Sequence, residues 1–385
     1  MSHPNGKELN FEEKLLRFIK RNRRNSKTHA VIGLIATAGI MFGFSFADRP
    51  PAPAVTQYKN EVFTASFMGD IMMGRDVEKV TDIKGQDYLF QQVKPLLQNS
   101  DYITANFDHP ITLDESAPKN ESKSIQLRTD KQSAQTLQNL NFSAVSLANT
   151  HAMDYNVQGL NDTRKTLKEH GIDPVGAGSN LKDAKNSISY REYNGIKVAT
   201  LAFTDVYAEG TKATEYNSGV LAMEPKNFVP MIAEAKKKAD FVFVNAHWGQ
   251  EYDTTPHPRQ KDLAKALADA GADVVIGHHP HVLSPVEVYK DSVIFYSLGN
   301  FVFDQGWSRT RESAIAQMRL MADGKARFEL TPLEIKAGQP APIREMNELQ
   351  KKKMIQQLTK NSKNLDWKEE NGKLIFEKDL SKKLD

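Results

Sequence analysis

The stretch FTASFMGD at residues 63–70 decides the fold class of this chain. Residues 63–68 form a largely apolar run, and Gly69 and Asp70 follow it directly. Such a run predicts a buried strand, and a side chain at its carboxyl end projects into the crevice where α/β proteins place their sites. Asp70 is therefore the first candidate residue of a functional site.

The same pattern recurs along the chain. Further strands are predicted at residues 102–106, 142–147, 197–203, 241–246 and 273–276. Helical spacing of apolar side chains is present at residues 130–140, 157–170, 225–238 and 258–270. This alternation predicts an α/β domain in which helices form layers around sheet. Later runs at residues 286–289, 293–297, 313–321 and 327–330 predict antiparallel pairing, so we expect a mixed sheet system.

Composition excludes several classes of function. The 385 residues include no cysteine, so disulfides, thiolate metal ligands and a cysteine nucleophile are excluded. The formal net charge is +3, and the first 27 residues alone carry a surplus of five positive charges. Subtracting five from +3 leaves −2 for the remainder, which gives no basis for a nucleic-acid surface.

The N-terminal part predicts attachment to a membrane. We expect a cytoplasmic basic tail at residues 1–27, a single transmembrane helix at residues 28–47 and a proline-containing linker at residues 48–60. The protein would then be a single-pass protein of the cell membrane, with its C-terminal domain outside the cell. A cleaved secretory signal is the alternative, but the long basic region and the lack of a clear small-x-small site favour an uncleaved anchor.

Acidic and imidazole side chains follow the predicted strands. Each of them alone is more commonly a turn, capping or hydrogen-bonded structural residue. Together at successive strand ends they predict a divalent-metal site, in which an extended backbone directs His279 and His281 to the same side. The predicted metal ligands are Asp70, Asp108, His247, His279 and His281.

Other residues near these ligands complete the predicted site. His151, Asp70 and Glu251 are the catalytic candidates, with Glu251 as a general acid or base or simply a solvated loop carboxylate. Arg75 is a candidate to bind an anion or to pair with Asp76 or Glu78. Asn149 and Asn300 are candidates to position a ligand, and Asn300 could instead brace the histidine loop.

The motifs at residues 69–75, 247–252, 277–282 and 297–305 resemble the CapA or PgsA family of poly-γ-glutamate capsule biosynthesis proteins, over residues 62–340. The resemblance implies a fold similar to calcineurin-like metallophosphoesterases, a four-layer α/β/β/α sandwich, here at residues 61–340. It also implies membrane-bound ligase and transporter-like partners. Metallophosphoesterases have Asp-x-His where this chain has Asp70 and Met72, so one imidazole of a two-metal site is replaced. Residues 341–385 are predicted to form a C-terminal helix and hairpin appendage.

Three functions follow as hypotheses. The first is a membrane-anchored subunit for synthesis or export of poly-γ-glutamate, whose rim binds a divalent cation (Mn, Zn or Mg), the polymer or both. The second is a metal-dependent hydrolase of phosphoesters or of polyglutamate at the cell surface, in which His151 stabilises or protonates the leaving oxygen. The third is a structural scaffold whose site has decayed.

Overall fold

The computed structural model describes residues 10–23, 26–46, 58–114, 116–306, 309–343, 348–360, 362 and 365–383. Residues 1–52 and 53–385 form two separate units. Most of the predicted linker at residues 48–60, and part of the predicted basic tail, lie outside the described residues.

The N-terminal unit contains two helices, α1 (Phe11–Asn22) and α2 (Ser26–Phe46). The Asn10 side chain accepts a hydrogen bond from the backbone N–H of Glu13, and the Glu13 carboxylate accepts one from the backbone N–H of Asn10, which together cap α1.

The predicted transmembrane helix is wrong. In the part of the chain that the structure describes, no helix combines the length and the apolar character that crossing a membrane requires. Helix α2 has 21 residues and covers most of the predicted span. The prediction of a single-pass membrane protein with its N-terminus in the cytoplasm is overturned with it.

A ten-stranded mixed sheet contains the predicted strand at residues 63–68 near its middle. Its order is β17-β18-β15-β14-β1-β2-β3-β4, with β13 beside β1 and β16 beside β15. The strands are β1 (Glu61–Ile71), β2 (Tyr102–Phe107), β3 (Ala144–Ser146), β4 (Asp173–Val175), β13 (Asn300–Val302), β14 (Glu312–Met321), β15 (Lys325–Lys336), β16 (Gln339–Pro342), β17 (Lys368–Glu370) and β18 (Lys373–Asp379). Strands β1 to β4 run parallel, whereas β14, β15 and β18 pair antiparallel. The mixed sheet predicted from the sequence is confirmed.

A second sheet of six strands has the order β11-β12-β10-β9-β7-β6. It consists of β6 (Ser189–Tyr193), β7 (Ile196–Thr204), β9 (Phe241–His247), β10 (Val274–His278), β11 (Val286–Tyr289) and β12 (Ser292–Phe295). Strands β7, β9, β10 and β12 are parallel, so their carboxyl ends share one edge. A two-stranded sheet joins β5 (Ala177–Gly178) to β8 (Gly219–Val220).

The two large sheets face each other, and aromatic side chains fill the space between them. Phe67 of β1 makes an edge-to-face contact with Phe243 of β9, with ring centroids 5.0 Å apart. Phe295 of β12 and Phe328 of β15 lie 6.4 Å apart in the same layer. Because apolar area removed from water dominates folding stability, this dry layer holds the two sheets together.

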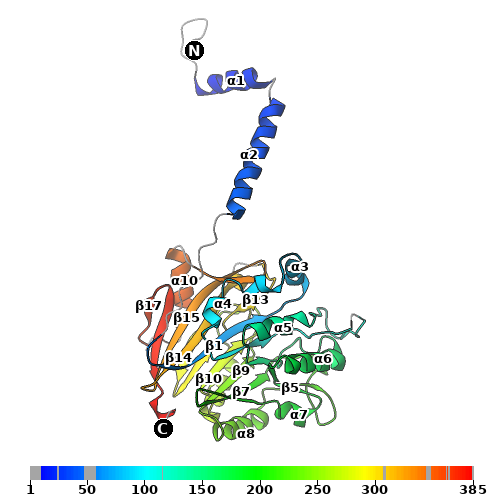
Figure 1. Ribbon diagram of the computed structural model, residues 1–385, viewed down its shortest axis with the longest axis vertical. Coiled ribbons are helices and arrows are strands. Elements are labelled where there is room, and N and C mark those ends of the chain that lie inside the picture. The colour runs from blue at the N-terminus through cyan, green and yellow to red at the C-terminus, as the bar shows by residue number, and fades with distance from the viewer. Residues whose placement is uncertain are drawn as a thin grey trace. The chain divides into compact units, whose positions relative to one another are not determined.

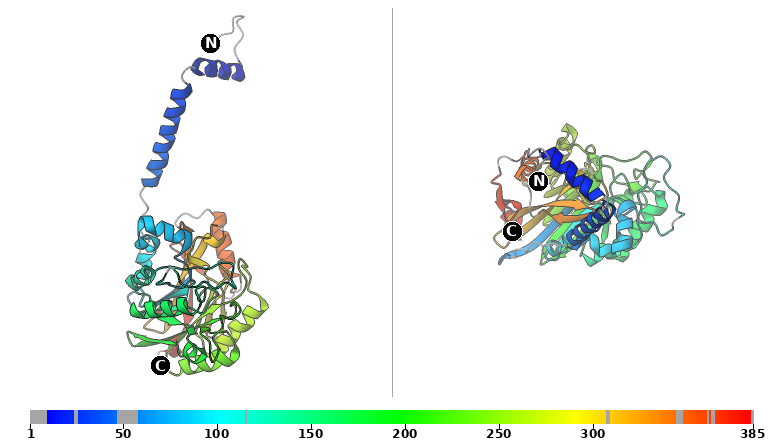
Figure 2. Two further views of the ribbon diagram at one scale, coloured as in Figure 1. Left: turned by 90° about the vertical axis from the view of Figure 1, so that its right-hand side faces the viewer. Right: turned by 90° about the horizontal axis from the view of Figure 1, so that it is seen from above.

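Helices cover the outer face of each sheet (Figures 1 and 2). Buried side chains of α3, α5 and α6 pack with β1, β2 and β3, and those of α8 and α9 pack with β7, β9 and β10. The order of layers is therefore helix, sheet, sheet, helix. The helices are α3 (Arg75–Lys84), α4 (Lys94–Leu97), α5 (Gln132–Asn139), α6 (Asn156–Glu169), α7 (Leu181–Lys185), α8 (Pro225–Lys236), α9 (Pro258–Ala270) and α10 (Glu348–Thr359).

Gly69 allows a close approach that shapes the edge of the first sheet. A Cβ at Gly69 would lie 1.8 Å from the carbonyl oxygen of Gly299, so no other residue fits there without moving the backbone. The approach lets β13 pair with the end of β1, with Asp70 opposite Asn300. Two residues far apart in sequence are thereby placed side by side.

Candidate metal centre

The carboxyl ends of strands from both sheets converge on Asp70. This residue lies near the end of β1 and is fully buried. The backbone N–H of His279 donates to Asp70 Oδ2 at 3.3 Å, and His281 Nδ1 lies 3.1 Å from the same oxygen. His278 Nδ1 lies 3.5 Å from Oδ1. The structure therefore brings Asp70 together with the histidine loop, as the strand-end pattern predicts.

Asp70 and His281 perturb each other's protonation. Burial opposes ionisation of Asp70, but the hydrogen bonds from His278 and His281 outweigh it and hold the pKa of Asp70 well below its usual range. Burial alone would lower the pKa of His281, yet Asp70 raises it to about 9. Asn300 Oδ1 also lies 2.8 Å from His281 Nδ1, so Asn300 braces the histidine ring. A metal-binding histidine is commonly oriented through its other nitrogen in this way.

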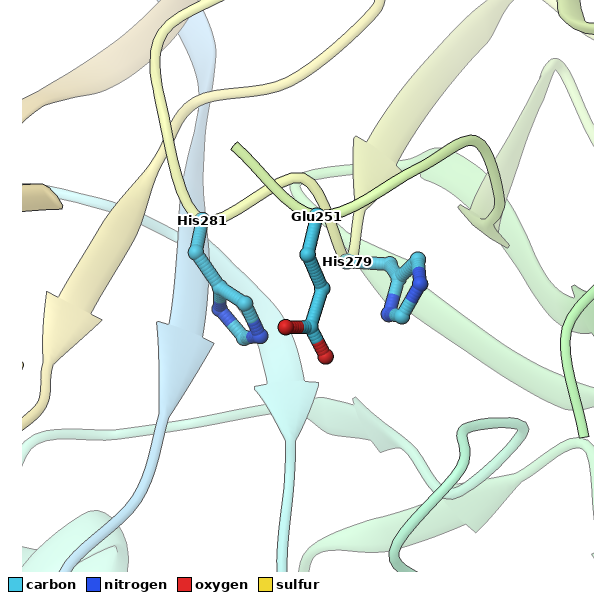
Figure 3. Close-up of side chains that lie close together, drawn as sticks. All are labelled: Glu251, His279 and His281. Carbon is cyan, nitrogen blue, oxygen red and sulfur yellow. The ribbon is translucent and has the colours of Figure 1, made fainter. Parts of the chain in front are cut away.

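Glu251, His279 and His281 form a cluster with metal-ligand spacing. One ligand atom from each lies within 4.8 Å of the others, and Figure 3 shows the Glu251 carboxylate between the two imidazole rings. Glu251 is exposed, whereas both histidines are buried. The two histidines do share a site, but the extended backbone expected for them is wrong. The φ angles of His279 and His281 are 93° and 57°, because β10 ends at His278 and the loop turns through left-handed conformations.

Several buried polar atoms near this cluster have no hydrogen-bond partner among the described residues. They are both carboxylate oxygens of Asp108, both ring nitrogens of His247 and Nδ1 of His279. Unpaired buried polar atoms are rare in folded proteins, because each costs about 1–3 kcal/mol. Here they belong to residue types that bind divalent cations, so the donor set fits a metal ion.

Burial changes the pKa values of these unpartnered groups in ways that favour metal binding. It lowers the pKa of His279 to about 3 and that of His247 well below the usual range, so both rings are neutral at pH 7. Their ring centroids are 4.6 Å apart. Burial raises the pKa of Asp108, which makes an uncompensated carboxylate there unfavourable. A cation would relieve that cost.

His151 lies in a separate polar group at the same edge. Its Nδ1 is 2.7 Å from Asp154 Oδ2, and the Lys123 ammonium lies 3.1 Å from that nitrogen. Lys123 also pairs with Asp154 and donates to the carbonyl of Thr150 at 2.6 Å. An imidazole held by a buried carboxylate is the arrangement expected of a general acid or base.

Three residues predicted to bind substrate have other bonds in the structure. The Arg75 guanidinium pairs with Asp304, with Nε 2.9 Å from Oδ2. Asn149 Nδ2 donates to the carbonyl of Phe107 at 2.8 Å, and its Oδ1 accepts the backbone N–H of His151 at 3.0 Å. Asn300 Nδ2 donates to the carbonyl of Thr310 at 3.1 Å. These side chains hold loops in place, and the predicted substrate contacts stay predictions.

Four further residues, in the centre or in the polar group around His151, were missed by sequence reasoning. Asn106 donates to Asp70 Oδ1 at 2.8 Å and accepts from Asn149 at 3.0 Å, so it links two strand ends. Asn245 lies 3.0 Å from His278 Nε2. Asn106 and Asn245 each stand two positions before a predicted metal ligand, Asp108 or His247, and this spacing is the sequence feature that could have identified them. His109 directly follows Asp108, and both of its ring nitrogens are buried without a hydrogen-bond partner among the described residues. Lys123 lies in a long connection and gave no local signal.

The fold and these side chains define an α/β protein with a candidate metal centre at the edge where two sheets meet. The chain belongs to the bacterial capsule synthesis protein family PGA_cap, whose sequence model matches residues 64–305. It is 50% identical to the PGA biosynthesis protein CapA of Bacillus subtilis (strain 168), over 98% of this chain and 99% of that protein. It is 44% identical to the capsule biosynthesis protein CapA of Bacillus anthracis, over 96% of this chain and 90% of that protein.

Among solved structures, the chain is similar to a 5'-nucleotidase precursor from Thermus thermophilus. The TM-score is 0.42 and the identity 11%, over 72% of this chain and 56% of that chain.

Proposed function

We propose that this protein takes part in the production of poly-γ-glutamate capsule polymer, and that its metal centre binds a divalent cation that holds carboxylates of the polymer. Family membership and the two Bacillus relatives named for capsule or PGA biosynthesis support the first part. The buried polar atoms without partners at Asp108, His247 and His279 carry the second part.

The residues of this centre have two roles, holding the cation and orienting its ligands. Glu251, His279 and His281 would hold the cation, with Asp70, Asp108 and His247 around them. Asp70 and Asn300 orient His281. When bound, a divalent cation supplies a hard Lewis acid toward carboxylate oxygens, which are the side groups of polyglutamate.

The decisive experiment compares two aspartates in a polymer-producing strain. Asp70→Asn removes the buried carboxylate of the centre, whereas Asp76→Asn changes an exposed aspartate that pairs with Lys79 on α3. We expect polymer output to fall at least about tenfold with Asp70→Asn and to stay at the parental level with Asp76→Asn. Parental output from the Asp70→Asn strain, with the protein present at its usual level, would refute the role of this centre.

Binding of the cation is tested on the purified full chain. Titration of chelator-treated protein with Mn²⁺, Zn²⁺ and Mg²⁺ by calorimetry should show binding that the double change His279→Ala and His281→Ala removes. The change His257→Ala is the control, because His257 pairs with Asp253 and is not one of the three cluster residues, and it should leave binding unchanged.

A metal-dependent hydrolase is the second candidate function, and the His151–Asp154 pair favours it. The pair could protonate a leaving oxygen of a phosphoester or stabilise a departing group of the polymer. Turnover of a generic phosphoester or of polyglutamate by the metal-loaded protein, lost in His151→Ala and kept in His170→Ala, would establish this function. No turnover on either substrate would exclude it for these substrates.

We also propose that the protein works in a polymer synthesis complex with ligase and transporter-like subunits. Two Mycobacterium tuberculosis relatives, named as probable polyglutamine synthesis accessory proteins, support an accessory role of this kind. Co-purification of those subunits with this chain from a producing strain tests the proposal, and their absence from the purified material would count against it.

A further inference from the structure

A cavity of about 860 Å³ lies beside the candidate metal centre. Its walls come from α10, from η3 (Arg309–Arg311) and from the two loops that carry the metal cluster. Thr254 follows Glu251 by three positions, and Val282 directly follows His281; both line the cavity. The cavity therefore continues from the loops that hold the cluster.

Helix α10 is fixed against the domain and forms one wall. Met354 and Leu358 are buried in the apolar layer between the sheets. Gln357 Nε2 donates to the carbonyl of Thr254 at 2.6 Å, which ties the helix to the Glu251 loop. Lys353 and Gln356 also line the cavity. The wall is thus an ordered surface whose polar groups are held at defined positions.

The cavity is positively charged. Arg309, Lys353 and Lys360 line it, against the single carboxylate of Glu312 among its described lining residues. Arg309 and Lys353 both act on the charge of Glu312, so the three cations and one carboxylate leave two positive charges in excess at the wall. An excess of cations at the wall of a cavity attracts anions, and arginine and lysine both donate charge-assisted hydrogen bonds to carboxylates.

We propose that this cavity binds a stretch of poly-γ-glutamate chain next to the units held at the metal centre. The inference rests on the proposed function, and it adds a second site with its own residues. Each unit of the polymer carries a free carboxylate and an amide, which match the cations Arg309 and Lys353 and the amide side chains of Gln356 and Gln357. A polymer with a carboxylate on every unit could contact the cavity and the metal cluster with neighbouring units, because the cavity and the cluster share two loops.

The test measures binding of a fluorescently labelled poly-γ-glutamate fragment to the purified full chain by fluorescence anisotropy. We expect Lys353→Gln to weaken binding at least about threefold, and the double change Arg309→Gln with Lys353→Gln at least about tenfold. Lys352→Gln is the matched control, because Lys352 is an exposed neighbour on the same helix outside the cavity. Circular dichroism verifies folding, and the single change at exposed Lys353 serves if the double variant does not fold.

Affinities equal to wild type in the cavity variants would overturn the proposal, as would an equal loss in Lys352→Gln. Tight binding of an acidic peptide with α-linked glutamates, without binding of the polymer fragment, would assign the cavity to a partner protein instead. Failure of the proposed function looks different, because polymer output would then be normal in the Asp70→Asn strain. Failure of this inference alone leaves that output low while the cavity variants bind the fragment as wild type does.

Discussion

Replacing Asp108 by asparagine should make the metal-free protein more stable while weakening its response to metal. Both carboxylate oxygens of Asp108 are buried without a partner among the described residues. An unsatisfied buried group costs about 1–3 kcal/mol, and more when it is charged. Asp108→Asn keeps the shape and removes the charge, so we expect the free energy of unfolding to rise by about 1–3 kcal/mol at pH 7 without metal.

The pH dependence has a defined sign. Burial raises the pKa of Asp108, so its protonated form is the one that the fold favours. The contribution of that proton to stability is present below the ordinary carboxyl pKa and is lost as pH rises through the raised value. The gain in free energy of unfolding that Asp108→Asn gives over wild type should therefore be absent at acidic pH and increase toward neutral pH.

Urea denaturation followed by circular dichroism measures these changes. A divalent cation at a hundred times its dissociation constant would stabilise wild type by about 2.7 kcal/mol, and Asp108→Asn by clearly less. Asp70→Asn is the matched contrast: Asp70 is bonded to Asn106 and His281, so the same substitution there should destabilise the metal-free protein. If Asp108→Asn destabilises the metal-free protein as Asp70→Asn does, the reasoning from unpartnered atoms fails.

Three further changes test other parts of the structure. Lys123→Met leaves the buried Asp154 carboxylate without its cation, so we expect unfolding in urea to become easier by about 2–4 kcal/mol, with exposed Lys119→Met neutral. Burial opposes ionisation of Glu329, but Lys373 and Arg319 outweigh it and lower its pKa to about 2. The contribution of the ionised Glu329 carboxylate to the free energy of unfolding is complete above the ordinary carboxyl pKa and is lost as pH falls toward 2. We therefore expect Lys373→Met to lower the free energy of unfolding by up to about 3 kcal/mol at pH 7 and by less near pH 2. Denaturation curves recorded over that pH range measure the difference. Gly69→Ala should lower stability by more than about 2 kcal/mol and weaken Mn²⁺ binding, because its Cβ would meet the Gly299 carbonyl; calorimetry that shows unchanged binding would contradict this.

The strands that carry the candidate centre could be predicted from the sequence because their apolar runs are long. β1, β9 and β10 lie where the runs at residues 63–68, 241–246 and 273–276 predict them. The short strands β4 and β5, of three and two residues, were not predicted. So few residues carry no readable period, and pairing with neighbouring strands decides their conformation.

Side-chain positions were predictable only where a strand end determines them. Asp70, His279 and His281 meet because β1 and β10, which belong to the two facing sheets, carry them at or just after their carboxyl ends on the same side of the sandwich. Lys123 reaches His151 from a connection 28 residues earlier, and nothing in the local pattern predicts that path. The transmembrane prediction was made from the apolar composition of residues 28–47, and no helix among the described residues has the length and apolar character that the prediction requires.

The candidate centre draws its two halves from different layers of the sandwich. Asp70 and Asp108 belong to the ten-stranded sheet or the loop after its second strand, while His247, His279 and His281 belong to the six-stranded sheet or the loop after it. A cation bound by residues of both halves would connect the two sheets directly. Occupancy of the site would then change the stability of the whole domain, because the ion would connect two sheets that otherwise meet through apolar side chains.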